Sequence, residues 1–243
     1  MRLDKYLADM NAGTRSEIKK VIRAGAVTVD GNLVKDPGFH VTDRASVTYK
    51  GKKIGYESLV YYMLHKPAGL ISASEDRKQK TVIDLLGKES RRDLFPAGRL
   101  DKDTEGLLLI TNDGGLAHHL LSPRHHVDKQ YFARIRGHVT EDDVKAFAEG
   151  LRINDDFVCM PAQLEILSAA PDNPSSESEM ISQVLVTIQE GKFHQIKKMF
   201  LAQGKEVIYL KRLSMGPLRL DPDLAPGEYR RLTDQEVEAL RSC

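Results

Sequence analysis

One short segment of the chain carries an arginine, an aspartate and a threonine directly before a run of aliphatic residues. Arg99, Asp101 and Thr104 lie between two expected turns at residues 96–98 and 105–106, and an apolar strand is expected to follow. Polar side chains on a loop that a rigid scaffold presents are often catalytic. An ionised aspartate in such a loop could act on a bound substrate. A carboxylate that only caps a turn is equally compatible with this pattern.

The same segment partly imitates a calcium-binding loop, because Asp101, Asp103 and Glu105 alternate before Gly106. In such a loop the twelfth position supplies a bidentate glutamate. Here that position is Asn112, and the intervening residues form an apolar strand. We therefore do not expect calcium binding.

Two pairs of neighbouring histidines suggest a different metal site. They are His118 with His119 and His125 with His126. Adjacent histidines on a helix point in different directions, and no downstream carboxylate has ligand spacing. We expect no metal, and a metal-dependent hydrolase that uses these histidines with Asp101 is kept as an alternative that metal analysis would test.

Composition and charge narrow the class of protein. The chain has 243 residues, of which 41% are hydrophobic and 29% charged, as in ordinary globular proteins. Cys159 and Cys243 have no zinc or disulfide spacing. The charged N-terminus is unlike a signal peptide, and no apolar run approaches the length of a membrane span. We expect a cytoplasmic protein without a membrane association.

Positive charge is concentrated near the N-terminus. Residues 1–60 hold eleven Lys/Arg and seven Asp/Glu, a net charge of +4, whereas the whole chain has a net charge of +1. Apolar spacing predicts a helix over residues 3–10 and a second helix that begins at Thr14 or Ser16 and ends near Gly25. One face of the second helix is basic. A strand, a turn at Asp30-Gly31 and a returning strand follow, and residues 45–54 predict another strand.

This order of elements resembles the S4 RNA-binding domain. The resemblance lies in residues 2–5 and in the run from Thr14 to Gly31. It implies that the basic helix contacts RNA phosphates, which gives affinity with little sequence selection. The implied RNA contacts are Arg15, Lys19, Lys20 and Arg23.

A second and larger domain is expected after a polar linker at residues 50–57. Strand and helix patterns alternate from residue 59 to the end, and residues 171–179 are expected to form a surface loop between two strands. We predict an S4 domain with its linker over residues 1–58 and a catalytic domain over residues 59–243. The fold class is α+β.

Five blocks of the larger domain resemble the RsuA/RluA-type pseudouridine synthases, particularly the RsuA branch, which acts on small-subunit ribosomal RNA. The central block is Gly98-Arg99-Leu100-Asp101-x-x-Thr104-x-Gly106-Leu107-Leu108. The others are residues 64–69, 122–131, 190–200 and 210–217. The likeness covers essentially the whole chain and implies a catalytic domain with a mixed, mostly antiparallel sheet. His65 and Lys197 depart from the pattern, since many relatives have Asn and Arg there.

The resemblance assigns roles to individual residues. Asp101 becomes the essential carboxylate that attacks ribose C1′ or removes the 2′ hydrogen of a flipped-out uridine, with Lys197 as its neighbouring cation. Tyr131 packs on the base and can act when the proton leaves C5, and Leu210 forms an apolar pocket wall. The implied RNA contacts near the site are Arg99, Arg124, His125 and His194.

The expected reaction is the isomerisation of a specific uridine to pseudouridine in small-subunit (16S) ribosomal RNA. It breaks the bond from ribose to N1, turns the base and rejoins it through C5, so it needs no cofactor. We expect a monomer. Two further alternatives remain: a synthase that acts on large-subunit ribosomal RNA, and a non-catalytic S4-type ribosome-assembly factor.

Overall fold

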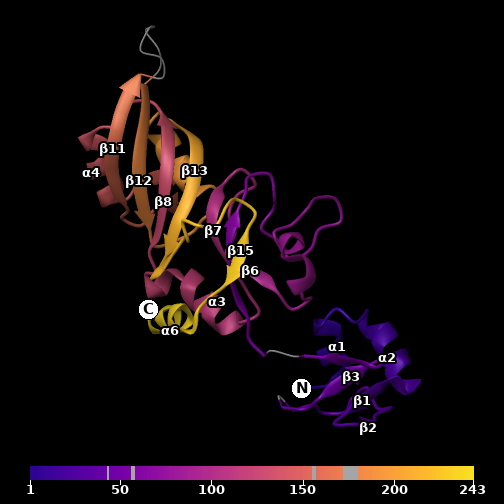
Figure 1. Cartoon of the computed structure of the whole chain (residues 1–243). Coiled ribbons are helices and arrows are strands. Elements are labelled where there is room, and N and C mark those ends of the chain that lie inside the picture. Colours follow the sequence, from indigo (N-terminus) through magenta and orange to yellow (C-terminus); the bar gives the residue numbers. More distant parts are fainter. Residues whose placement is uncertain (43, 56–57, 155–156, 172–179) are drawn as a thin grey trace.

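The computed structural model describes residues 1–42, 44–55, 58–154, 157–171 and 180–243. Figure 1 shows a small N-terminal unit, a larger sheet-based body and a C-terminal helix packed against that body. None of the helices in the described ranges has the length and hydrophobicity that crossing a membrane requires.

The N-terminal unit has two helices against a four-stranded sheet in the order β2-β1-β3-β4. Its core is formed by one cluster that includes Leu3, Leu7, Ile18 and Ile22. The elements are α1 (Leu3–Asp9), α2 (Arg15–Arg23), β1 (Val27–Val29), β2 (Asn32–Leu33), β3 (Val47–Tyr49) and β4 (Lys52–Ile54).

The basic helix α2 begins directly after Thr14, which is one of the two candidate N-cap residues. Thr14 is the N-cap of α2 and forms a capping box with Glu17, in which the Thr14 hydroxyl accepts from the Glu17 amide at 3.3 Å. Glu17 in return accepts from the Thr14 amide at 2.7 Å. A capping box satisfies two amides that a helix start leaves unpaired, which fixes the start of α2.

Residues 45–54 differ from the single strand that the sequence predicts. They form β3 and β4, joined by a turn at Lys50 and Gly51 with φ of 48° and 77°. Positive φ at both central residues is the conformation of a two-residue hairpin turn. The predicted linker was therefore wrong over Lys50–Ile54, which belongs to the hairpin, and residues 56–57 lie outside the described residues. The domain boundary at residues 58/59 stays a prediction.

The larger body is built on a nine-stranded sheet, whose main path runs β11-β12-β8-β13-β7-β5-β15. All its pairings are antiparallel except that of β13 with β7. Its first elements are β5 (Tyr61–Lys66), η1 (Ile83–Glu89), β6 (Phe95–Ala97), β7 (Glu105–Thr111), α3 (Gly114–Leu121), η2 (Pro123–His125), β8 (Lys129–Arg136) and α4 (Glu141–Glu149). The later ones are β9 (Arg152–Asn154), β10 (Phe157–Val158), β11 (Gln163–Pro171), β12 (Met180–Ile188), α5 (Gln195–Ala202), β13 (Glu206–Met215), β14 (Leu218–Arg219), β15 (Tyr229–Arg231) and α6 (Asp234–Ser242).

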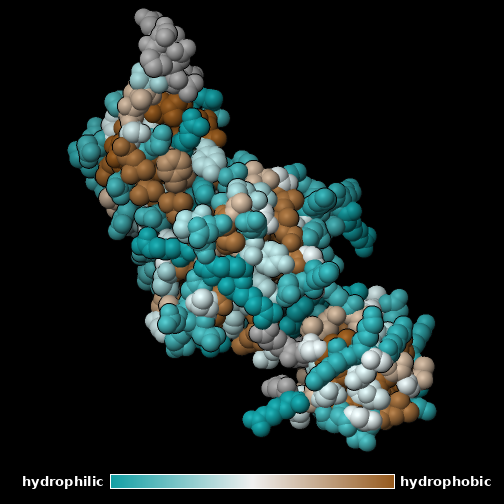
Figure 2. Space-filling model, in the orientation of Figure 1, coloured by the Kyte–Doolittle hydropathy of each residue, from teal (hydrophilic) through white to brown (hydrophobic). Residues whose placement is uncertain are grey.

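Alternate residues of β8 and β12 face the core, whereas nearly every residue of β5 and β7 is buried. On β8, Tyr131, Ala133 and Ile135 are buried, whereas the residues between them are partly or fully exposed. This period of two is expected of a sheet with one covered face. Phe147 of α4 and Phe200 of α5 pack in the same cluster as these strands. Figure 2 shows hydrophobic residues interspersed with hydrophilic ones on the visible face of this part of the body.

The turns that the sequence predicts around the Asp101 segment are both displaced. Pro96 lies in β6, and Glu105 and Gly106 already belong to β7, which starts two residues earlier than expected. The start of β7 pairs with β13 rather than turning, because Gly106 lies opposite Arg212. The predicted loop over residues 171–179 is flanked by β11 and β12 as expected, but residues 172–179 lie outside the described residues.

Candidate active site

The loop that carries Asp101 lies where the sheet changes partners. β7 and β13 pair in parallel over only two residue pairs, Lys211 with Glu105 and Arg212 with Gly106. A β-carbon at Gly106 would lie 2.2 Å from the carbonyl oxygen of Arg212, so only glycine permits this close approach. Asp101 precedes β7 in the chain and is thereby held at the middle of the sheet.

Buried hydrogen bonds fix the backbone of this loop. The Ser72 hydroxyl donates to the Leu100 carbonyl at 2.8 Å and accepts from the Leu100 amide at 3.1 Å. Two residues further on, the Gly69 amide donates to the Lys102 carbonyl at 2.7 Å. The loop is therefore tied to the chain that follows β5 at both ends.

Lys66, the last residue of β5, adds a third anchor. Its side chain is fully buried, and Nζ donates to the carbonyls of Pro67, Lys102 and Thr104 at 3.0, 3.2 and 2.8 Å. Burial lowers the pKa of Lys66 to about 8, against the opposing charges of Asp103 and Asp101. Lys66 lies in the block of residues 64–69, but the resemblance to the family assigned it no role.

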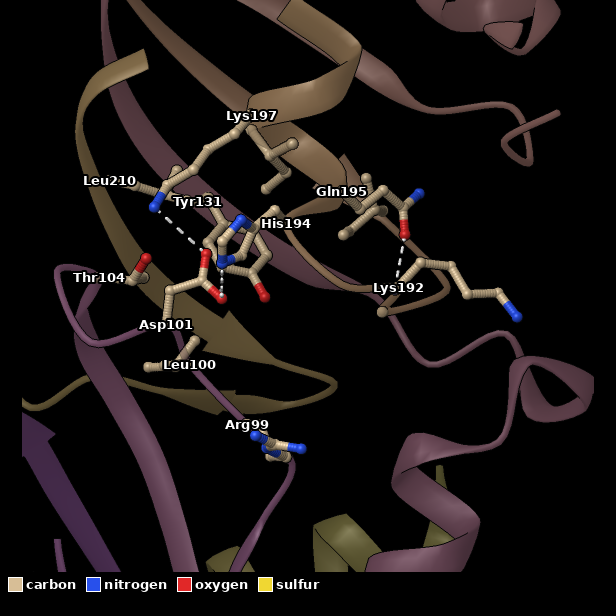
Figure 3. A pocket seen from close by; sticks show the side chains of 13 residues that line it. Arg99, Leu100, Asp101, Thr104, Tyr131, Lys192, His194, Gln195, Lys197 and Leu210 are labelled. Atoms are coloured by element: carbon tan, nitrogen blue, oxygen red, sulfur yellow. Dashed lines mark hydrogen bonds and ion pairs between the residues drawn. The ribbon is translucent and has the colours of Figure 1, made fainter. Parts of the chain in front are cut away.

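A single pocket brings together six of the predicted site residues: Arg99, Asp101, Tyr131, His194, Lys197 and Leu210. We call it the Asp101 pocket. The remaining lining residues are Leu100, Thr104, Ile188, Gly191, Lys192, Gln195 and Ile196. Figure 3 shows the Asp101 carboxylate pointing toward the side chains of Lys197 and His194.

Two basic side chains flank the Asp101 carboxylate. Lys197 Nζ lies 3.3 Å from Oδ2, and His194 Nε2 lies 3.5 Å from Oδ1. Lys197 comes from α5, and His194 is the residue before that helix, with a left-handed backbone at φ 54°. Lys197 and His194 therefore both lie beside the Asp101 carboxylate, and the RNA contact expected of His194 stays a prediction.

Lys197 also reaches a second carboxylate. Its Nζ lies 2.6 and 2.8 Å from the two oxygens of Asp103. Burial of Asp103 acts to raise its pKa. The hydrogen bond that Lys197 donates and the charge of Lys197 outweigh this effect and lower the pKa of Asp103. Burial of Lys197 acts to lower its pKa, but the hydrogen bond that it donates to Asp103 and the charges of both aspartates raise that pKa overall. Lys197 is therefore held as an ammonium ion between two carboxylates.

A buried glutamate shapes the loop before α5. Glu190 accepts from the Gln195 amide group at 2.8 Å and from the Met160 backbone amide at 2.9 Å. Gln195 in turn accepts from the Lys192 amide at 3.0 Å. These bonds fix the chain that presents His194 and Lys197 to the Asp101 pocket.

The opposite wall of the pocket comes from the central strands. Tyr131 of β8 and Leu210 of β13 are both buried and lie in adjacent strands, with Tyr131 opposite Arg212 and Leu210 opposite Ala133. An aromatic ring and an aliphatic side chain beside a carboxylate form a surface that suits a planar base.

The other predicted RNA contacts lie outside this pocket. Arg124 and His125 are exposed on η2, where the His125 ring packs against that of His119 with centroids 4.1 Å apart. Arg15, Lys19, Lys20 and Arg23 lie on α2 of the N-terminal unit, and Figure 1 shows α2 apart from strands β7, β8 and β13. Among the residues that the structure describes, no three His, Cys, Asp or Glu side chains gather as metal ligands do.

Comparison with known proteins identifies the family to which this chain belongs. The model of the RNA pseudouridylate synthase family matches residues 60–202. The chain belongs to the pseudouridine synthase family. It is therefore an enzyme of the isomerase class, and the S4 domain model matches its residues 1–46. The expected order of an S4 domain and a synthase domain with a mixed, mostly antiparallel sheet is confirmed.

Relatives match this synthase over nearly its full length. An uncharacterised RNA pseudouridine synthase of Bacillus subtilis is 48% identical, over 99% of this chain and 98% of the relative. Ribosomal small subunit pseudouridine synthase A of Vibrio cholerae is 39% identical, over 99% of each chain. A crystal structure of a pseudouridylate synthase, 36% identical, covers 99% of both chains with a TM-score of 0.67.

Proposed function

We propose that this synthase converts one uridine of small-subunit ribosomal RNA to pseudouridine, with Asp101 as the catalytic carboxylate. The observation that carries the catalytic assignment is the position of Asp101, which lies 3.3 Å from Lys197 in a pocket that Tyr131 and Leu210 also line. The relatives named ribosomal small subunit pseudouridine synthase A, from Vibrio cholerae and Escherichia coli, support the choice of RNA.

The reaction begins when a uridine leaves its helical stack, at a cost of a few kcal/mol. The Tyr131 ring and the Leu210 side chain offer the flipped base an apolar contact in place of its stacked neighbours. Arg99 also lines the Asp101 pocket. In this proposal it contacts the RNA strand beside the flipped nucleotide.

Asp101 then acts on the ribose as an anion. It attacks C1′ or removes the 2′ hydrogen, and either route releases uracil from its N1 bond to the sugar. Lys197 supplies a positive charge at 3.3 Å that stabilises the ionised carboxylate. After the base has turned and rejoined through C5, the C5 proton leaves, and the Tyr131 hydroxyl assists that transfer.

The N-terminal unit supplies affinity for the RNA. Arg15, Lys20 and Arg23 are exposed on α2, and phosphate contacts from such a face bind RNA with little sequence preference. Selection of the uridine would then depend on the Asp101 pocket and on residues near it, including Arg124 and His125.

Two RNA substrates test the proposed target. Purified enzyme is incubated with small-subunit or large-subunit ribosomal RNA, each transcribed with tritium at uracil C5. We expect release of about one tritium per small-subunit RNA and none from large-subunit RNA. Release from the large-subunit RNA alone would overturn the proposed target but not the family, and a partly assembled small subunit serves as a second substrate if free RNA is inert.

A further inference from the structure

The cation that pairs with Asp101 is shared with a neighbour in the chain. Lys197 Nζ lies within 2.8 Å of both Asp103 oxygens, which is closer than its 3.3 Å approach to Asp101. The Asp103 side chain is 72% exposed, whereas that of Asp101 is 20% exposed. Asp103 thus contacts Lys197 from the solvent side, and Asp101 contacts it from within the pocket.

The position of Asp103 is rigid although its side chain is exposed. The carbonyl groups of both its neighbours, Lys102 and Thr104, accept hydrogen bonds from the buried Lys66 ammonium group. The Thr104 amide also donates to the Asp101 carbonyl at 3.1 Å. A fixed turn therefore carries both carboxylates.

Lysine at position 197 needs such a second contact more than arginine would. A guanidinium group binds a carboxylate through two parallel hydrogen bonds, which fix its orientation. An ammonium group is a point charge on a flexible four-carbon stem, so one carboxylate does not fix its position. In this structure the second contact comes from Asp103.

We propose that Asp103 is a positioning residue, which holds the Lys197 ammonium group where it pairs with Asp101 during the reaction. The inference rests on the proposed catalytic role of Asp101. Asp103 itself does not touch the reacting atoms. As an exposed anion it repels RNA phosphates, so its removal affects turnover without weakening RNA binding.

Single-turnover tritium release from small-subunit RNA, with the full-length enzyme, tests this role. The variants are Asp103→Asn, Asp103→Glu, Lys197→Arg and the double variant Asp103→Asn/Lys197→Arg. Asp142→Asn is the matched control, because Asp142 is also exposed and pairs with a lysine, Lys145, that lies outside the Asp101 pocket. Thermal unfolding of each variant checks the fold.

We expect Asp103→Asn to slow the reaction about five- to tenfold at saturating enzyme, with RNA affinity equal to or tighter than that of the wild type. Asp103→Glu is expected to keep most of the wild-type rate, because glutamate retains the carboxylate. In the Lys197→Arg background, Asp103→Asn changes the rate by less than about twofold, since the guanidinium group binds Asp101 without help. Asp142→Asn has no effect.

Four results would overturn the inference: an unchanged rate in Asp103→Asn, an equal loss in both backgrounds, a loss confined to RNA affinity, or a faster reaction on removal of Asp103. These outcomes are distinct from a failure of the proposed function. A wild-type enzyme that is inactive on both free small-subunit RNA and the partly assembled small subunit would refute the proposed function. An active wild type that Asp103→Asn leaves unchanged would refute only the positioning role.

Discussion

Lys66 Nζ lies 2.8 Å from the carbonyl oxygen of Thr104, so a buried charge at the end of β5 holds the turn that presents Asp101. The same ammonium group bonds the Lys102 carbonyl, on the other side of Asp103. A charged donor that serves three backbone acceptors is strong where water is excluded. The geometry of the Asp101 pocket thus depends on a residue that does not line it.

Replacement of Lys66 by methionine is expected to impair both folding and catalysis. Three carbonyl groups lose their donor, which costs about 3 kcal/mol of unfolding free energy. The Asp101 turn also loses its anchor, and misplacement of a catalytic group by about 1 Å can reduce a rate about 100-fold. Chemical denaturation and single-turnover kinetics measure the two effects. A variant with wild-type kinetics would show that the turn holds its position without Lys66.

Gly106→Ala tests the close approach of β7 and β13. The new β-carbon would lie 2.2 Å from a backbone oxygen and 2.6 Å from a backbone nitrogen of Arg212, at a φ of +103°. We expect a loss of about 3 kcal/mol, which lowers the melting temperature by about 10 °C in a protein of this size. Gly114→Ala is the control, because a β-carbon added at Gly114 would meet nothing within 4 Å. Equal melting temperatures for the two variants would contradict the steric account.

The sequence predicted which residues gather in the Asp101 pocket better than it predicted the strand boundaries around that pocket. Asp101, Lys197, Tyr131 and Leu210 come from segments far apart in the chain, and a resemblance to known synthases placed them in one site where hydrophobic periodicity alone would not. The N-terminal helices followed from local signals, apolar spacing and the Thr14 capping box. Such signals depend only on neighbouring residues.

The features that were not predicted from the sequence depend on contacts between segments that are far apart in the chain. Gly106 looked like part of a turn, but its pairing with Arg212 makes it part of β7. Lys50 and Gly51 looked like a linker because they are polar, yet a polar pair with positive φ also forms a hairpin turn. The second partner of Lys197 could not be predicted, since Asp103 faces α5 only once the sheet has formed.

Tyr131→Phe separates the two roles proposed for Tyr131. The ring remains to pack against the base, so RNA affinity is expected to stay within about twofold of the wild type. Loss of a group that assists proton transfer slows a reaction by about 100-fold or more. Release of tritium from C5 under single-turnover conditions measures this step directly. A wild-type rate would restrict Tyr131 to packing.

An ion pair outside the Asp101 pocket predicts how the free energy of unfolding changes at low pH. Arg230 donates to both carboxylate oxygens of Glu236 at 2.8 Å, and this hydrogen bond lowers the pKa of Glu236 from 4.5 to about 2. Because the folded-state pKa is lowered, the stabilisation is present above pH 4.5 and is lost as the pH falls toward 2. The pair is partly exposed, so Glu236→Gln is expected to cost about 1 kcal/mol at pH 7.

Melting temperatures of the wild type and Glu236→Gln between pH 7 and pH 2 check this dependence. The difference between the two proteins is expected to shrink steadily below pH 4.5. A difference that stays constant down to pH 2 would show that the charge of Glu236 does not contribute, and that the substitution acts through the α6 capping box instead.

Asp101→Asn tests whether the Asp101 carboxylate performs the isomerisation. The substitution keeps the shape of the side chain and removes its charge. The measurement is tritium release from uracil C5 of small-subunit ribosomal RNA, with wild type and variant at equal RNA occupancy. We expect about one tritium released per RNA by the wild type and none by the variant. Release by Asp101→Asn at the wild-type rate would contradict it.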